Sequence, residues 1–149
     1  MSSDLQQLYQ QIILQHAKDR HGDGLAEVPA GARSGESHQL NPTCGDEITL
    51  RAVMAGARLD GISWEGQGCS ISMASASVLT DMMAGLDREE ALALVEDFRE
   101  LMRSRGTMEP DEEVLGDAAA FAGVSRYPAR VKCAMLAWVA LEEAVLAAA

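Results

Sequence analysis

The chain has 149 residues, 48% of them hydrophobic, and a formal net charge of −11. This length and apolar content predict a single domain over residues 1–149 with a real core. The negative charge argues against nucleic-acid binding, because the sequence has no basic cluster that would attract a phosphate backbone. The sequence contains neither an export segment nor an apolar run long enough to cross a bilayer, so we expect a cytoplasmic protein that binds no membrane.

The N-terminal half reads as one helix followed by strands. Apolar residues recur at helical spacing from Asp4 to Lys18, which predicts an amphipathic helix. Residues 19–37 are rich in Gly, Asp, Pro and Ser and are expected to form a mobile loop. Alternation of apolar and polar residues predicts strands at Glu47–Met54 and Leu59–Glu65, and another strand is expected to begin within His38–Leu40.

The C-terminal half is predicted to be helical. A small-residue-rich stretch, Ser70–Ala84, indicates a buried helix, and Asp87 is placed to cap the next one. A short helix is expected at Asp117–Ala122, and the last helix is expected at Cys133–Ala148, with the segment around Pro128 leading into it. Because the strands are segregated from the helices, the fold class is α+β: a small antiparallel sheet of about three strands covered by helices.

The three cysteines lie in predicted turns or at predicted helix starts, positions that suit metal binding or nucleophilic attack by a thiolate. Cys44 lies with Gly45 and Asp46 in a turn just before a strand. Cys69 precedes one predicted helix, and Cys133 opens another. The positive end of a helix lowers the pKa of a thiol, so both of these cysteines are expected to form thiolates readily.

Three thiolates and the carboxylate of Asp46 make a four-ligand set that suits tetrahedral zinc. Sulfur ligands also suit copper(I) and iron–sulfur clusters, but not magnesium or calcium. Zinc with these ligands would carry a charge of about −2, which Arg130 and Lys132 beside Cys133 can offset. The sequence has no C-x-x-C pair, so spacing alone leaves open that the cysteines only fill the core.

At these cysteines the sequence resembles a known family, the iron–sulfur cluster assembly scaffold (IscU/NifU N-terminal) superfamily, and within it the SufU-like zinc-dependent sulfurtransferases. The segments that carry the resemblance are 8–16, NPTCGD at 41–46, EGQGCSISMASAS at 65–77 and GVSRYPARVKC at 123–133. Classical scaffolds are similar but have His where this chain has Lys132, and they lack the insertion expected here at about 96–116. Residues 19–24 depart from the family pattern, which puts contacts made by that loop in doubt.

The resemblance implies an IscU/SufU-like fold with one zinc ion held by Cys44, Asp46, Cys69 and Cys133. It implies a partner of the SUF system, a SufS-like cysteine desulfurase that depends on pyridoxal phosphate and carries sulfur as a persulfide. A histidine of that enzyme would displace Cys44 from zinc, and Cys44 would accept the sulfur and pass it toward a downstream cluster-assembly scaffold. Arg130 would orient or neutralise the acceptor thiolate.

Two alternatives remain beside the sulfurtransferase. The same four ligands suit a scaffold on which an iron–sulfur cluster is assembled, although Lys132 in place of His argues against this function. A non-catalytic, zinc-stabilised binding module is the other, and Asp46 argues against it because closed structural zinc sites prefer Cys or His. The three histidines lie away from the motifs and are expected on a helix surface or in loops: His16, His21 and His38.

Overall fold

The structure is a computed structural model that describes residues 3–148, apart from the side chain of Ser3. In chain order its elements are α1 (Ser3–Asp19), β1 (Arg33–Asn41), β2 (Asp46–Ala55), β3 (Arg58–Gln67), α2 (Ser70–Met83), α3 (Arg88–Arg103), α4 (Glu112–Leu115), the 3₁₀ helix η1 (Gly116–Arg126) and α5 (Pro128–Ala147). The predicted α+β fold is confirmed. None of the helices in the described part of the chain is long and apolar enough to cross a membrane.

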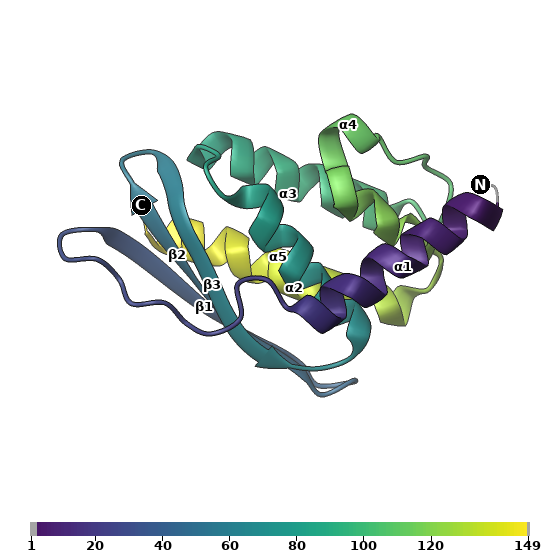
Figure 1. Cartoon of the computed structure of the whole chain (residues 1–149), viewed down its shortest axis with the longest axis horizontal. Helices are drawn as coiled ribbons and strands as arrows, with labels where there is room; N and C mark the ends of the chain where they lie inside the picture. Colours follow the sequence, from purple (N-terminus) through teal and green to yellow (C-terminus); the bar gives the residue numbers. More distant parts are fainter. Residues whose placement is uncertain (1–2, 149) are drawn as a thin grey trace.

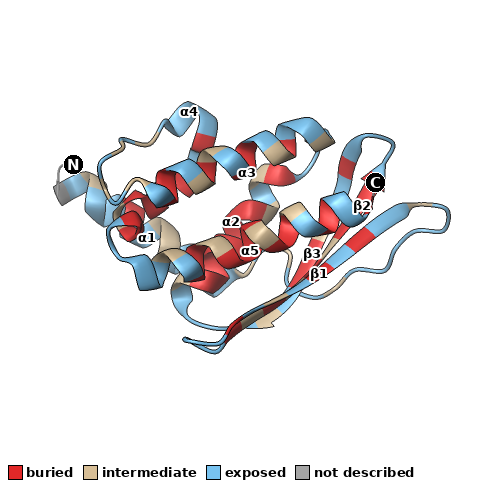
Figure 2. Cartoon of the chain, turned by 180° about the vertical axis from the view of Figure 1, so that it is seen from behind, coloured by how far each residue is buried: buried red, intermediate tan, exposed pale blue. Residues whose placement is uncertain are grey.

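The three strands form an antiparallel sheet in the order β1-β2-β3. Ile48, Leu50 and Ala52 on β2 are at most 1% exposed and point to the same side, as the alternating pattern predicted. The helices cover only this face of the sheet (Figure 1). Buried residues accordingly gather on the inner strand positions and along α2, α3 and α5 (Figure 2).

The loop after α1 ends earlier than expected, because residues 33–37 form the first half of β1. Gly35 and Ser37 make this stretch look like a loop in the sequence, yet both are buried against α5. A Cβ atom at Gly35 would lie 1.8 Å from the carbonyl oxygen of Ala144. The strand therefore uses small residues because the α5 backbone packs directly on it.

The rest of that loop is fastened to β3. The amide of Gly24 donates to the carbonyl of Trp64 at 2.7 Å, and the amide of Trp64 donates to the carbonyl of Gly22 at 2.9 Å. The indole N–H of Trp64 also donates to the carbonyl of His21 at 2.8 Å. These bonds pair part of the loop with the outer edge of β3, which would otherwise present unpaired backbone groups.

The core is organised around α5, whose Trp138 is fully buried. Its ring stacks on Phe98 of α3 with the centroids 4.1 Å apart, and its N–H donates to Ser75 of α2 at 2.9 Å. The N-terminus of α3 carries a capping box made by Asp87 and Glu90, which confirms the predicted cap. The contacts of Trp138 hold α2, α3 and α5 against one another.

The segment expected as an insertion, about 96–116, forms the second half of α3, a connecting loop and α4. The hydroxyl of Tyr9 on α1 donates to Glu112 on α4 at 2.5 Å and ties the segment to the N-terminal helix. The short helix predicted after it is present as the longer 3₁₀ helix η1.

Candidate metal centre

Four residues predicted as ligands meet at one end of the sheet. Cys44 lies in the turn between β1 and β2, and Asp46 is the first residue of β2. Cys69 is the N-cap of α2, and Cys133 lies in the second turn of α5. The fold thus brings together side chains that are up to 89 residues apart in the sequence.

The turn that carries Cys44 is closed by its own backbone. The amide of Gly45 donates to the carbonyl of Asn41 at 2.8 Å, and the side-chain oxygen of Asn41 accepts from the amide of Thr43 at 3.2 Å. Gly45 has a φ of +73°, a conformation that glycine adopts at little cost. Cys44 is consequently exposed on a short, well-defined turn.

Two of the separations between ligand atoms match those of a tetrahedral zinc site. With Zn–S bonds of about 2.3 Å and Zn–O bonds of about 2.1 Å, two sulfur ligands lie about 3.8 Å apart and a sulfur and an oxygen about 3.6 Å apart. The Sγ atoms of Cys44 and Cys133 are 3.7 Å apart, and Cys69 Sγ lies 3.7 Å from Asp46 Oδ2. Ligand atoms of Cys44, Asp46 and Cys133 all lie within 4.8 Å of one another. Cys44, Asp46 and Cys133 thus form a compact donor set that suits a zinc ion, whereas Cys69 contacts Asp46 but lies outside this group of mutually close atoms.

The cysteines do not simply fill the core. All three are free thiols, and both Cys44 and Cys69 are exposed, whereas Cys133 is buried. An exposed cysteine gains little from packing, so the core-filling interpretation is wrong for Cys44 and Cys69.

Asp46 is held in place by hydrogen bonds to both of its carboxylate oxygens. It is 1% exposed; Oδ1 accepts from the amide of Cys69 at 3.0 Å, and Oδ2 accepts from the hydroxyl of Ser72 at 2.6 Å. Burial opposes ionisation of the carboxyl group, but hydrogen bonds from Ser72, Cys133 and Cys69 outweigh it and hold the pKa of Asp46 below its usual value. The site thus contains an ionised, oriented carboxylate beside three sulfur atoms.

The sequence analysis missed Ser72 and the contact that Gly68 makes with Asp46. Ser72 lies within 3.5 Å of Cys69 Sγ as well as against Asp46. Gly68 leaves room for the carboxylate, because a Cβ atom there would lie 2.5 Å from Asp46 Oδ1. A detectable signal was the spacing of Cys69 and Ser72, since the N-cap and the third helical residue face each other across the first turn of a helix.

The prediction that Cys133 opens a helix is wrong. The helix α5 begins five residues earlier, with Pro128 as its first residue and Tyr127 as its N-cap, and so Cys133 lies beyond the first turn. Burial, with hydrogen bonds to Asp46 and the other cysteines, raises the pKa of Cys133 well above the usual thiol value. Cys69, in contrast, does sit at the N-terminus of α2.

The two cations near Cys133 are both exposed. The guanidinium of Arg130 lies over the ring of Tyr127, 5.4 Å from its centroid. None of the hydrogen bonds and ion pairs found among residues 3–148 joins Arg130 or Lys132 to the four predicted ligands. The role of Arg130 toward the acceptor thiolate therefore stays a prediction.

The histidines form contacts elsewhere. His16 is buried between Ser77 at 2.8 Å and Asp117 at 3.1 Å, so both of its ring nitrogens have partners. His21 lies 2.8 Å from Asp81, and His38 lies 2.7 Å from Glu47 on the neighbouring strand. The expected exposed positions are confirmed for His21 and His38, whereas His16 faces inward from α1.

Comparison with known proteins finds similar sequences over nearly the whole chain. The family model of the NifU-like N-terminal domain matches residues 8–134. A relative from Bacillus subtilis (strain 168), the zinc-dependent sulfurtransferase SufU, is 41% identical over 97% of this chain and 93% of its own length. The iron–sulfur cluster assembly scaffold protein IscU of Streptococcus pyogenes serotype M1 is 40% identical over 96% of this chain and 86% of its own.

Solved structures share the fold. A proposed iron–sulfur cluster assembly scaffold protein for the SUF system from Fervidobacterium islandicum AW-1 superposes with a TM-score of 0.73 and 34% identity, covering 90% of this chain and 93% of that chain. A NifU-like protein from Brucella abortus superposes with a TM-score of 0.77 over 93% of this chain and 92% of that chain, and at 23% identity it supports the fold alone. The chain belongs to the NifU-like N-terminal domain family, the iron–sulfur cluster assembly scaffold superfamily of IscU and SufU.

Proposed function

We propose that this protein is a zinc-dependent sulfurtransferase. It would accept persulfide sulfur from a cysteine desulfurase that depends on pyridoxal phosphate, for iron–sulfur cluster assembly in a SUF-type system. The observation that carries the proposal is the placement of Cys44: it is exposed on a turn, its Sγ lies 3.7 Å from that of Cys133, and its ligand atom groups with those of Asp46 and Cys133 within 4.8 Å. The named activity of the Bacillus subtilis relative supports the same function.

The four side chains have different tasks in this proposal. Bound zinc would keep Cys44 deprotonated, and thus nucleophilic, and would shield its sulfur until a partner arrives. Asp46, Cys69 and Cys133 come from the start of β2, the N-cap of α2 and the interior of α5, so they would hold the metal whether or not Cys44 moves. Cys44 Sγ contacts only Cys133 Sγ among the described hydrogen-bond partners, which leaves its turn free to present the sulfur.

The proposed transfer of sulfur from one persulfide to another needs no oxidant. The Cys44 thiolate attacks the outer sulfur of the desulfurase persulfide, the S–S bond of that persulfide breaks, and the desulfurase thiolate leaves. Cys44 ends as a persulfide, and the proton of the donor persulfide passes to the leaving thiolate or to water. Arg130, one helical turn before Cys133, is proposed to stabilise the anionic sulfur at this stage.

A scaffold that assembles an iron–sulfur cluster is the second candidate. The donor set also suits a cluster as cargo, and the Streptococcus pyogenes relative of similar identity is named a scaffold. Lys132, exposed beside Cys133, offers no imidazole ligand where the classical scaffolds have one, and this favours the sulfurtransferase.

The deciding experiment is metal analysis and a visible spectrum of the purified chain, followed by desulfurase turnover with cysteine in its presence. We expect one zinc ion per chain, no colour and faster turnover, and Cys44→Ser should abolish the stimulation. Bound iron with visible absorption, together with unchanged turnover, would establish the scaffold function instead. The matched control is Ser34→Ala, which alters an exposed side chain on β1 at the end of the sheet opposite the Cys44 turn and leaves every sulfur in place.

A further inference from the structure

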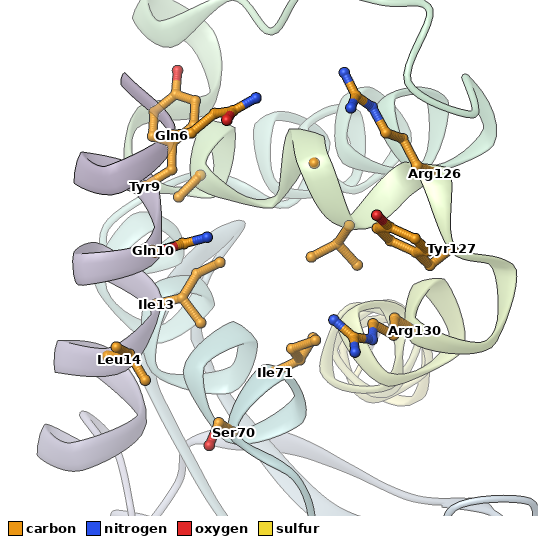
Figure 3. A pocket seen from close by; sticks show the side chains of 13 residues that line it. Gln6, Tyr9, Gln10, Ile13, Leu14, Ser70, Ile71, Arg126, Tyr127 and Arg130 are labelled. Atoms are coloured by element: carbon orange, nitrogen blue, oxygen red, sulfur yellow. The ribbon is translucent and has the colours of Figure 1, made fainter. Parts of the chain in front are cut away.

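A surface groove of about 540 Å³ runs between α1 and the junction of η1 with α5. Figure 3 shows Gln6, Gln10 and Leu14 on the α1 wall, with Arg126 and Arg130 on the wall across from them. Ile13, Ile71 and Val124 are among the apolar residues that line it. The groove thus has a cationic wall, a polar amide wall and an aliphatic lining.

The cationic wall is unusual in a chain with a net charge of −11. Throughout the described residues, neither Arg126 nor Arg130 has a carboxylate within ion-pair distance, although acidic residues outnumber basic ones 23 to 12. Gly106 lets the Arg126 side chain lie across the backbone, since a Cβ atom there would be 2.6 Å from Arg126 Cγ. Arg130 is steadied by the ring of Tyr127. Two unpaired guanidinium groups on one wall of the groove favour carboxylates from outside the chain.

The apolar part of the groove is exposed as well. Leu14 is 62% exposed and Tyr127 is 55% exposed, high values for large apolar side chains that lie on opposite walls of one groove. Contiguous apolar surface beside unpaired cations is typical of a binding surface. The complementary ligand carries aliphatic side chains next to carboxylates.

The shape favours an extended peptide. At about 1.5 Å of helix per residue, the wall from Gln6 to Leu14 is about 12 Å long. About four residues of an extended chain span that length at about 3.3 Å each. The side-chain amides of Gln6 and Gln10 can both donate to and accept from a peptide backbone laid along α1.

The groove adjoins the metal centre. Ser70, which lines it, directly follows the predicted ligand Cys69, and Arg130 lies one helical turn before Cys133. A protein that reaches Cys44 therefore comes within reach of the groove. We propose that the groove docks a short acidic and aliphatic segment of the cysteine desulfurase and so orients that enzyme over Cys44; this inference rests on the proposed function.

The test is the dissociation constant of the complex between the zinc-loaded chain and its desulfurase, measured by titration at low and moderate salt. We expect Arg126→Gln and Leu14→Gln each to weaken binding about tenfold, and Arg126→Gln to flatten its salt dependence. Arg58→Gln removes the same charge from the exposed hairpin between β2 and β3, far from the groove, and is expected to leave the dissociation constant unchanged. Zinc content and unfolding temperature verify that each variant is folded.

The outcomes separate the two proposals. If both groove variants bind as tightly as the wild type while desulfurase stimulation still depends on Cys44, the groove assignment is overturned and the proposed function stands. An equal loss of affinity in Arg58→Gln would reveal general electrostatic attraction and would also overturn the groove. If the wild-type chain does not bind the desulfurase at all, both proposals fail together.

Discussion

The hydroxyl of Ser72 donates to Asp46 Oδ2 at 2.6 Å, and both side chains are almost fully buried. The amide of Cys69 holds the other carboxylate oxygen from the same helical turn. The first turn of α2 therefore fixes the orientation of the one oxygen ligand in the predicted zinc site. Outer hydrogen bonds of this kind commonly decide how firmly a metal ligand binds.

We predict that Ser72→Ala weakens zinc retention without unfolding the chain. Loss of an outer hydrogen-bond partner typically lowers metal affinity about 10- to 100-fold, because the ligand is no longer held in the binding orientation. Competition with a chromophoric chelator measures the affinity, and Ser70→Ala serves as the matched control because that side chain is exposed. Equal affinities for the two variants would show that Asp46 does not need Ser72.

A second prediction concerns the space beside Asp46. A Cβ atom at Gly68 would lie 2.5 Å from Asp46 Oδ1 and 2.9 Å from its carboxyl carbon, so Gly68→Ala must displace the carboxylate. We expect zinc content of the purified protein to fall, as measured by elemental analysis. Gly61→Ala on β3, the strand that ends just before Gly68, is the control, because its new Cβ atom would meet only Val53 at an ordinary 4.0 Å. Full zinc content in Gly68→Ala would remove Asp46 from the ligand set.

Much of the fold could be predicted from local patterns. The alternation along β2 as far as Ala52 and the Asp87–Glu90 capping box are signals of single elements, and both are present. The start of β1 was predicted wrongly because it depends on packing against a distant part of the chain. The start of α5 was predicted wrongly because the first residue of the helix was placed too late. Gly35 is small because α5 approaches it, which a sequence read as local segments does not reveal, and Pro128 begins the helix that was expected only at Cys133.

The candidate ligands of the metal centre could be predicted from the sequence, but the residues that hydrogen-bond to them could be predicted less well. Cys44 and Asp46 stand out because a thiol, a glycine and a carboxylate share one turn, and Cys69 because glycines precede it. Ser72 is one of three buried serines on α2, and only its spacing from Cys69 sets it apart in the sequence. Its contact with Asp46 depends on the packing of α2 against the start of β2, which local patterns do not reveal.

A third prediction follows from Tyr9. Burial, with the neighbouring carboxylate of Glu112, raises the pKa of Tyr9 from its usual value near 10 to about 12. Between these values the folded chain keeps the phenol proton and the unfolded chain releases it, so stability is complete below pH 10 and falls as the pH rises toward 12. At about 1.4 kcal/mol per pKa unit, the loss approaches roughly 2–3 kcal/mol.

Urea denaturation at closely spaced pH values from 9 to 12 measures this loss. Tyr9→Phe, which has no phenol to titrate, should show a flatter dependence of the free energy of unfolding on pH. The same slope in both proteins would mean that other groups cause the alkaline destabilisation.

The last prediction is that zinc links metal binding to the stability of the whole chain. The four predicted ligands come from the turn before β2, from β2 itself, from the N-cap of α2 and from α5, so one ion would cross-link three separate parts of the fold. Because the unfolded chain cannot assemble this set, zinc at about 1,000 times its dissociation constant would add about 4 kcal/mol to the free energy of unfolding. A strong chelator should therefore lower the unfolding temperature of the wild type, and added zinc should restore it.

Cys133→Ala should be less stable from the start and insensitive to the chelator, since it removes a buried ligand at the centre of the set. A chelator effect of equal size in Cys133→Ala would place the stabilising metal somewhere other than these four residues.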